Sequence, residues 1–96
     1  MKYLFIYEKE LNDYLKSYAM FFAKGFMYGS LYNINGHPAA VARNYHEKVN
    51  GKIYILENIN FDYLDSFEGE NYIRESILIY TETTIIPCWV YLLRKF

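Results

Sequence analysis

The spacing of apolar residues along the chain predicts six strands and two helices. Short runs rich in aromatic and β-branched residues predict strands over residues 2–7, 26–33, 39–43, 52–56, 71–81 and 84–94. After the first strand the period changes, because apolar residues recur at three- and four-residue steps from Leu11 to Phe22. This spacing predicts an amphipathic helix of roughly three turns, and Gly25 is expected to end the helix and its connection.

A second, shorter helix is predicted just before the last two strands. Asn60 is a good N-cap residue, and Phe61, Leu64 and Phe67 fall on or near one face of the segment that follows. Gly69 suits the position after the last helical residue. Glu68 is therefore expected in the last turn of this helix.

Glycine and proline predict where the strands turn. Asn35-Gly36-His37-Pro38 is expected to be a turn, because glycine accepts positive φ and proline fixes its own φ. Asn50-Gly51 predicts a hairpin directly before the strand over 52–56. Pro87 has no N–H to donate, so it predicts an edge or a bulge in the last strand. Both faces of that strand are largely apolar, which predicts that it is covered on both sides.

The order of these elements is β-α-β-β-β-α-β-β, which has too few helices for a doubly wound sheet. It predicts an α+β fold, in which a curved, partly closed mixed sheet of about six strands packs against two helices. No repeat, linker or low-complexity segment divides the sequence, so residues 1–96 are expected to form a single domain.

Composition and charge exclude several classes of function. The chain is 53% apolar and 22% charged, which is ordinary for a globular protein, and its formal net charge of -1 provides no basic field for nucleic acid. No apolar run approaches the length that crosses a bilayer, and the first is too short for a signal peptide. We therefore expect no membrane association and a cytoplasmic location. The single cysteine, Cys88, agrees with a reduced compartment.

The sequence contains no metal-binding pattern. His37 and His46 lack ligand-like spacing to other His, Cys, Asp or Glu residues, so neither a metal site nor a cofactor is expected. Cys88 lies in an apolar strand pattern without a recognisable base partner, which is typical of a core residue.

One segment does carry a specific chemical signal. Leu64-Asp65-Ser66-Phe67-Glu68-Gly69, followed by Tyr72-Ile73-Arg74, resembles the L-D-x-x-E-G turn and Y-x-R strand of the gamma-glutamylcyclotransferase-like (AIG2-like) proteins. Further pieces occur in the family's order: Tyr7 with Leu11, Gly29-Ser30-Leu31-Tyr32 with Gly36 and Pro38, Gly51 with Tyr54, and Trp89-Val90-Tyr91. Tyr28-Gly29-Ser30-Leu31 copies the family's Y-G-S-N-L loop, but its place after the first helix matches the second strand of the family pattern.

The resemblance implies an activity and a site. Proteins of this family cyclise a gamma-glutamyl group to 5-oxoproline and release an amine, and the glutamate that corresponds to Glu68 acts as general acid and base. The substrate would be a small gamma-glutamyl amine or peptide, held by Tyr7, Glu8, Lys9, Glu10, Leu11 and Tyr72. A free glutamate titrates near ~4.3, so this role requires burial among aromatic side chains that raises the pKa.

The neighbours of Glu68 have simpler expectations. Asp65 is expected to be a carboxylate on the helix surface rather than a partner in the site. Tyr72 and Arg74 fall on one strand face, so Arg74 is expected to form a structural ion pair with a nearby acid, while Tyr72 borders the pocket.

One departure from the family pattern keeps other functions open. The family has glycine directly after the loop tyrosine, where this chain has Glu8. Two like charges about 4 Å apart repel by roughly 4 kcal/mol at an effective dielectric of ~20, which would oppose binding of a substrate carboxylate unless Lys9 compensates. A non-catalytic small-molecule-binding or interaction module of the same fold is therefore an alternative. A third alternative is a subunit of a larger assembly, with exposed aromatic strands as its contact surface. The sequence determines neither the identity of the leaving amine nor the oligomeric state.

Overall fold

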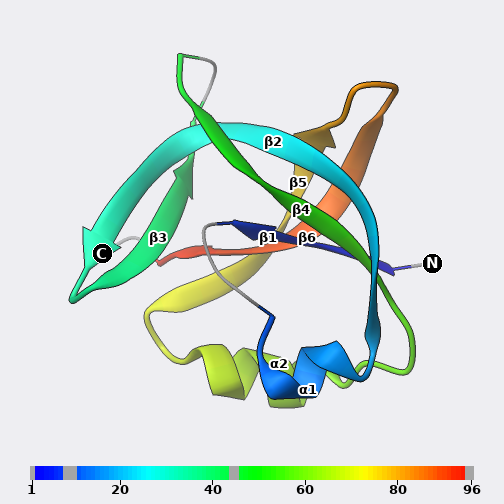
Figure 1. Cartoon of the computed structure of the whole chain (residues 1–96). Helices are drawn as coiled ribbons and strands as arrows, with labels where there is room; N and C mark the ends of the chain where they lie inside the picture. Colours follow the sequence, from blue (N-terminus) through cyan, green and yellow to red (C-terminus); the bar gives the residue numbers. More distant parts are fainter. Residues whose placement is uncertain (1, 8–10, 44–45, 95–96) are drawn as a thin grey trace.

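The computed structural model describes residues 2–7, 11–43 and 46–94. Its elements in chain order are β1 (Lys2–Tyr7), α1 (Asp13–Lys16), β2 (Ala19–Ile34), β3 (His37–Ala42), β4 (Lys48–Leu56), α2 (Phe61–Glu68), β5 (Tyr72–Tyr80) and β6 (Ile85–Leu93). The strands curve around a common interior, and the two helices lie together at one end of it (Figure 1).

Five of the strands close into a small barrel. The sheet order is β3-β2-β4-β1-β6-β5, and β2 also pairs with β5 through Phe26 and Tyr80, which joins the two ends. β1 runs parallel to β6, with Leu4 opposite Trp89, and the other neighbours are antiparallel. β3 is an extra strand that extends from β2 as a hairpin. The predicted α+β fold with a curved mixed sheet is confirmed.

The predicted first helix is wrong in length. α1 ends at Lys16, and β2 begins at Ala19 and runs for 16 residues as the long arc that crosses the top of Figure 1. Ala19 pairs with Leu56 and Ala23 with Ile53, with a register shift between Phe21 and Ala23. The apolar run 19–23 matches a helical period by coincidence, since pairing with β4 makes it a strand.

The roles predicted for Gly25 and Gly51 are also wrong. Neither ends an element: they face each other in the middle of β2 and β4, and Gly51 also lies opposite Tyr7 of β1. A Cβ on Gly51 would overlap the Ile6 carbonyl oxygen and lie 2.6 Å from Phe5 Cζ. These glycines allow strands and core side chains to approach closely inside a narrow barrel.

The predicted turn and the second helix are confirmed. Asn35 and Gly36 take φ values of 51° and 83° between β2 and β3, as a two-residue hairpin requires. Asn60 Oδ1 accepts a hydrogen bond from Tyr63 N at the start of α2, and Gly69 follows its last residue with a φ of 93°. Pro87 pairs with Leu78 of β5, while the bridge from β6 to β1 falls two residues later, in agreement with an edge position for Pro87.

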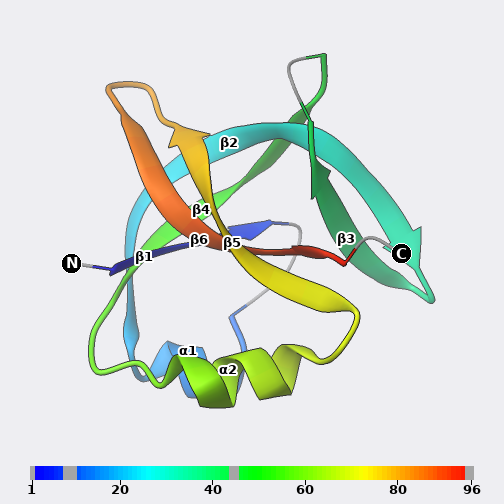
Figure 2. The same ribbon diagram turned by 180° about the vertical axis from the view of Figure 1, so that it is seen from behind.

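Two apolar clusters fill the molecule. The barrel interior holds Phe5, Tyr7, Met27, Ala40, Val49, Ile53, Ile79, Cys88, Val90 and Leu92. The second cluster lies between the barrel and the helices and consists of Leu4, Ile6, Leu15, Leu56, Leu64 and Tyr91. The last strand contributes to both, so the prediction that it is covered on both faces is confirmed. Figure 2 shows both helices from behind, below the strands.

Candidate active site

Glu68 lies at the end of α2, half-buried against the barrel. Its inward orientation follows from the helix spacing, because Phe61, Leu64, Asp65 and Glu68 recur at three- and four-residue steps. Leu64 is only 1% exposed and anchors this face of the helix in the second apolar cluster. Glu68 is therefore directed at the barrel rather than at solvent.

Glu68 borders two adjoining spaces. An open cleft of about 290 Å³ is lined by Ile34, Asn35, His37, Pro38, Glu68, Asn71 and Tyr72. A much smaller cavity of about 10 Å³ lies toward the core, between Glu68 and Phe5, Ile6, Tyr7, Tyr72 and Tyr91. The carboxylate thus stands between a cleft open to a ligand and a wall of aromatic side chains.

Three tyrosines surround this carboxylate, one each from β1, β5 and β6. Burial raises the pKa of Tyr7 to about 12, and the negative charge of Glu68 adds to the increase. Burial and the same charge raise the pKa of Tyr72. Burial, together with its hydrogen bond to Asp65, raises the pKa of Tyr91. All three phenols are therefore neutral at pH 7 and place no additional charge beside Glu68.

The Tyr7 hydroxyl joins three strands at the base of the site. It donates a hydrogen bond to the Tyr91 carbonyl of β6 at 2.6 Å and accepts one from the Ala40 amide of β3 at 3.1 Å. Tyr72 donates a longer hydrogen bond, at 3.4 Å, to the Pro38 carbonyl, also in β3. β3 is the outer wall of the cleft, and these bonds hold it against the barrel.

Asp65 lies at the helix surface as predicted, with 40% of its side chain exposed, but it is also the acid that pairs with Arg74, so the predicted ion pair of Arg74 is confirmed. Asp65 Oδ1 accepts hydrogen bonds from Arg74 Nε at 2.8 Å and from the Tyr91 hydroxyl at 2.5 Å, and Oδ2 accepts one from Arg74 Nη2 at 3.3 Å. These bonds lower the pKa of Asp65, chiefly through the Arg74 hydrogen bond. Packing of α2 across β5 and β6 brings this carboxylate to Arg74 and Tyr91, which a helix pattern read alone does not reveal.

The family of the chain follows from residues 6–95, which match the family model described as Gamma-glutamyl cyclotransferase, AIG2-like. The chain belongs to this family. No curated protein matches the chain. The family resemblance predicted from the Leu64 to Arg74 segment is confirmed.

Two solved structures show the same fold as this gamma-glutamyl cyclotransferase-like chain. The crystal structure of YkqA from Bacillus subtilis has a TM-score of 0.78 and 21% sequence identity, over 97% of this chain and 36% of that one. An AIG2-like protein from Mus musculus has a TM-score of 0.76 and 21% identity, over 100% of this chain and 79% of that one. The chain therefore spans about a third of the length of YkqA.

Within this gamma-glutamyl cyclotransferase-like fold, the site residues expected from the sequence have different outcomes. Glu68, Tyr7 and Tyr72 come together around the small cavity. Leu11 is partly buried and packs on the second apolar cluster, near Leu15. Glu8, Lys9 and Glu10 lie outside the described residues.

Tyr91, His37 and Asn71 border the site but were not identified from the sequence as site residues. Tyr91 could have been found from strand pairing, because it lies opposite Arg74 across β5 and β6 and so shares the sheet face that meets α2. His37 and Asn71 reach the cleft only through the packing of the β2–β3 hairpin near the end of α2. No local pattern marks them.

Three other features of this AIG2-like chain concern metal binding, cysteine reactivity and membrane-spanning helices. Among residues 2–7, 11–43 and 46–94, no three His, Cys, Asp or Glu side chains are grouped as metal ligands. Burial raises the pKa of the Cys88 thiol to about 12, so this cysteine is a poor nucleophile. No helix in the described part of the chain is long and apolar enough to cross a membrane.

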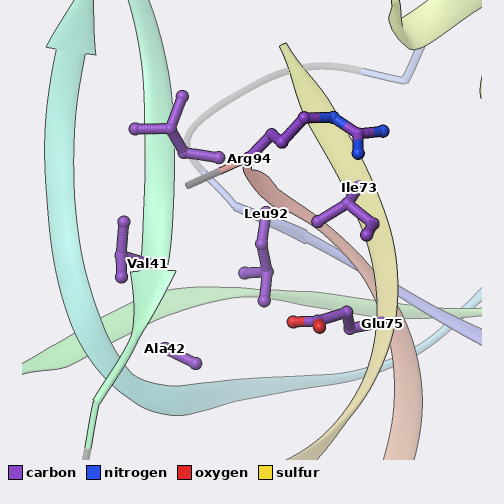
Figure 3. A pocket seen from close by; sticks show the side chains of 7 residues that line it. Val41, Ala42, Ile73, Glu75, Leu92 and Arg94 are labelled. Atoms are coloured by element: carbon purple, nitrogen blue, oxygen red, sulfur yellow. The ribbon is translucent and has the colours of Figure 1, made fainter. Parts of the chain in front are cut away.

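A second cavity, of about 320 Å³, lies between β3 and the β5–β6 pair and holds another carboxylate. Figure 3 shows Val41, Ala42, Ile73 and Leu92 around it, with Glu75 and Arg94 at its edge. Glu75 neighbours Arg74 in β5, so its side chain points to the opposite face of the strand from the Asp65 ion pair. Glu75 is therefore a carboxylate near the same end of the barrel that does not line the Glu68 cleft.

Proposed function

We propose that this chain is a gamma-glutamyl cyclotransferase and that Glu68 is its general acid and base. The observation that carries the proposal is a half-buried carboxylate, set between a ligand-sized cleft and three neutral tyrosines, in a chain of this family. A carboxylate at the edge of such a cleft is within reach of a bound substrate, to which it can pass protons and from which it can take them.

The reaction needs no nucleophile from the protein. The α-amine of the substrate attacks its own γ-carbonyl carbon, a new C–N bond closes the five-membered ring, and the C–N bond to the leaving amine breaks. The attacking nitrogen loses two hydrogens in passing from ammonium to ring amide, and the leaving nitrogen gains two in departing as an ammonium. Glu68 relays these protons one at a time and ends the cycle in its starting state.

The larger of the two spaces beside Glu68 is of a size to take the substrate, whereas the small cavity, of about 10 Å³, has room for about one water molecule. The α-carboxylate of the gamma-glutamyl group would be held by the family loop, which in this sequence runs from Tyr7 through Glu8, Lys9 and Glu10 to Leu11. The leaving amine would occupy the larger cleft, where His37, Asn35 and Asn71 supply polar contacts. The long hydrogen bond from Tyr72 to Pro38, at 3.4 Å, is one that a substrate oxygen can replace as acceptor.

The test is release of 5-oxoproline by the purified protein from a panel of gamma-glutamyl amines and peptides, measured by mass spectrometry. We expect turnover by the wild type and a loss of about 10²–10⁴-fold in Glu68→Gln, the range for removal of a general acid or base. Glu75→Gln is the matched control, because it removes the same charge from the other cavity, and it should keep near-normal turnover. Full activity in Glu68→Gln, or no product from any substrate, would contradict the proposal.

Glu8 favours a second candidate, a non-catalytic binding module, because it replaces the glycine of the family loop. This candidate predicts that a gamma-glutamyl amine or 5-oxoproline binds without turnover and that the affinity survives Glu68→Gln. Calorimetric titration of both proteins measures this. Turnover by the wild type excludes the second candidate.

A further inference from the structure

Asp65 and Glu68 lie on the same face of α2, one helical turn apart. Asp65 is held by three hydrogen bonds, two from Arg74 and one from Tyr91. Its side chain is 40% exposed, whereas that of Arg74 is 20% exposed. The Asp65 carboxylate, one helical turn before Glu68, is therefore held in place by side chains of the barrel.

Arg74 is itself held in place by aromatic rings from two other elements. Its guanidinium carbon lies 4.1 Å from the Phe61 ring centroid and 4.4 Å from that of Trp89. Phe61 belongs to α2, Trp89 to β6 and Arg74 to β5. Contact with two rings and a two-point hydrogen bond restrict the orientation of the guanidinium, so this contact fixes how α2 is rotated on the barrel.

The pair also contributes to the charge near Glu68. Tyr7, Tyr72 and Tyr91 face Glu68 from β1, β5 and β6, and His37 of β3 lies across the cleft. Arg74 and Asp65 carry opposite charges and contact each other directly, so together they present almost no net charge to Glu68. Removal of either one would leave the other charge uncompensated beside the site.

We propose that Asp65 and Arg74 are positioning residues for Glu68, which fix its direction and cancel each other's charge one helical turn away from it. This inference rests on the proposed cyclotransferase function, because it assigns the pair a role in that reaction. It predicts two effects: loss of the pair lowers the rate through misplacement of Glu68, and loss of one partner shifts the pH dependence with a sign set by the charge that remains.

The variants are Asp65→Asn, Arg74→Gln, the double variant and Arg74→Lys. Asp65→Asn leaves a cation, which stabilises the ionised base, so the acid limb of the kcat/KM profile moves to lower pH. Arg74→Gln leaves an anion and moves this limb to higher pH. Each shift is expected to be about half a pH unit or more.

The remaining variants separate charge from position. In the double variant the limb returns to the wild-type pH, while kcat stays about 10-fold low and KM changes by less than about 3-fold. Arg74→Lys keeps the positive charge but loses the two-point hydrogen bond of the guanidinium. The acid limb of its kcat/KM profile should therefore stay at the wild-type pH, and its kcat should lie between those of the wild type and the double variant. Asp13→Asn is the matched control, because it breaks an exposed pair with Lys16 at 3.6 Å and should change neither quantity.

A second measurement keeps this inference distinct from the proposed function. The Glu68 side-chain carboxyl carbon can be titrated by NMR in the folded wild type, the two single variants and the double variant, without any turnover. Opposite displacements of its midpoint in Asp65→Asn and Arg74→Gln support the positioning role, even if no 5-oxoproline is ever released. Displacements that are absent, or equal in sign, in folded variants overturn it.

Discussion

The strongest stability prediction concerns the hydroxyl of Tyr7. Tyr7→Phe removes one buried oxygen that is hydrogen-bonded to both the Tyr91 carbonyl and the Ala40 amide. Tyr7 is 4% exposed and Ala40 0%, so water cannot reach these groups in place of the hydroxyl without a change in packing. A buried polar group left without a partner costs about 1–3 kcal/mol, so the two together predict a loss of roughly 2–6 kcal/mol at pH 7.

The same residue predicts how stability changes in alkali. The pKa of Tyr7 is about 12 in the folded protein, and an unfolded tyrosine titrates near ~10. The folded-state pKa is the higher one, so the contribution of Tyr7 is complete below pH ~10 and is lost as the pH rises toward 12. Between these values the unfolded chain has lost its proton and the folded protein has not, so the free energy of unfolding falls by roughly 1.4 kcal/mol per pH unit.

The assay is urea unfolding of the wild type and Tyr7→Phe from pH 7 to 11. The stability gap between them should narrow above pH ~10, because the variant has no proton to lose at this position and the other tyrosines are common to both. Tyr63→Phe is the control: this side chain is 51% exposed, and its loss should change stability by less than about 0.5 kcal/mol. A gap below about 0.5 kcal/mol at pH 7, or one that stays constant with pH, would refute the placement of the hydroxyl between β1, β3 and β6.

Two further predictions test the barrel. Gly51→Ala should destabilise the protein by about 1–3 kcal/mol or more in thermal unfolding, because the new methyl group meets the Ile6 carbonyl and the Phe5 ring. Gly36→Asn, in an open turn where asparagine tolerates positive φ, should have little effect. Cys88, 1% exposed and with a thiol pKa of about 12, should react with a thiol reagent at pH 8 far more slowly in the native protein than in denaturant. Native labelling as fast as denatured labelling would show that the barrel interior is not closed at this point.

Local chemistry is sufficient to predict some parts of this fold. The cap at Asn60, the end of α2 at Gly69 and the turn at Asn35-Gly36 depend on the residue type at one position and its own backbone, and all three are found in the structure. The assignment of Glu68 to the site came from the family resemblance, and its position at an inward helix end agrees with that expectation.

Other parts depend on partners distant in sequence. Gly25 and Gly51 look like turn residues until β1 and β5 are placed against them. The run from Tyr18 to Phe22 fits a helix and a strand equally well, and β4 decides between them. The partners of Asp65, Arg74 and Tyr91, come from the last two strands, so the helix sequence alone does not reveal them. In each case the missing information is a long-range contact.

The closure of the barrel between β2 and β5 has a consequence for how the protein folds and fluctuates. A single bridge joins Phe26 to Tyr80, and their rings stack at a centroid distance of 5.3 Å. The β2–β3 and β5–β6 hairpins are contacts between neighbours in sequence, whereas this seam joins residues far apart along the chain, and such contacts form late because their loop-closure entropy is large. Of the pairings that close the ring, this seam and the β1–β6 pairing are each formed by a single bridge, whereas the other neighbours pair over six or more residues. Tyr80 lies at the opposite end of β5 from Tyr72, and the hydrogen bonds of Tyr7 and Tyr72 hold β3 beside the cleft. An opening of the seam would therefore loosen the far end of the barrel while the candidate site keeps its walls.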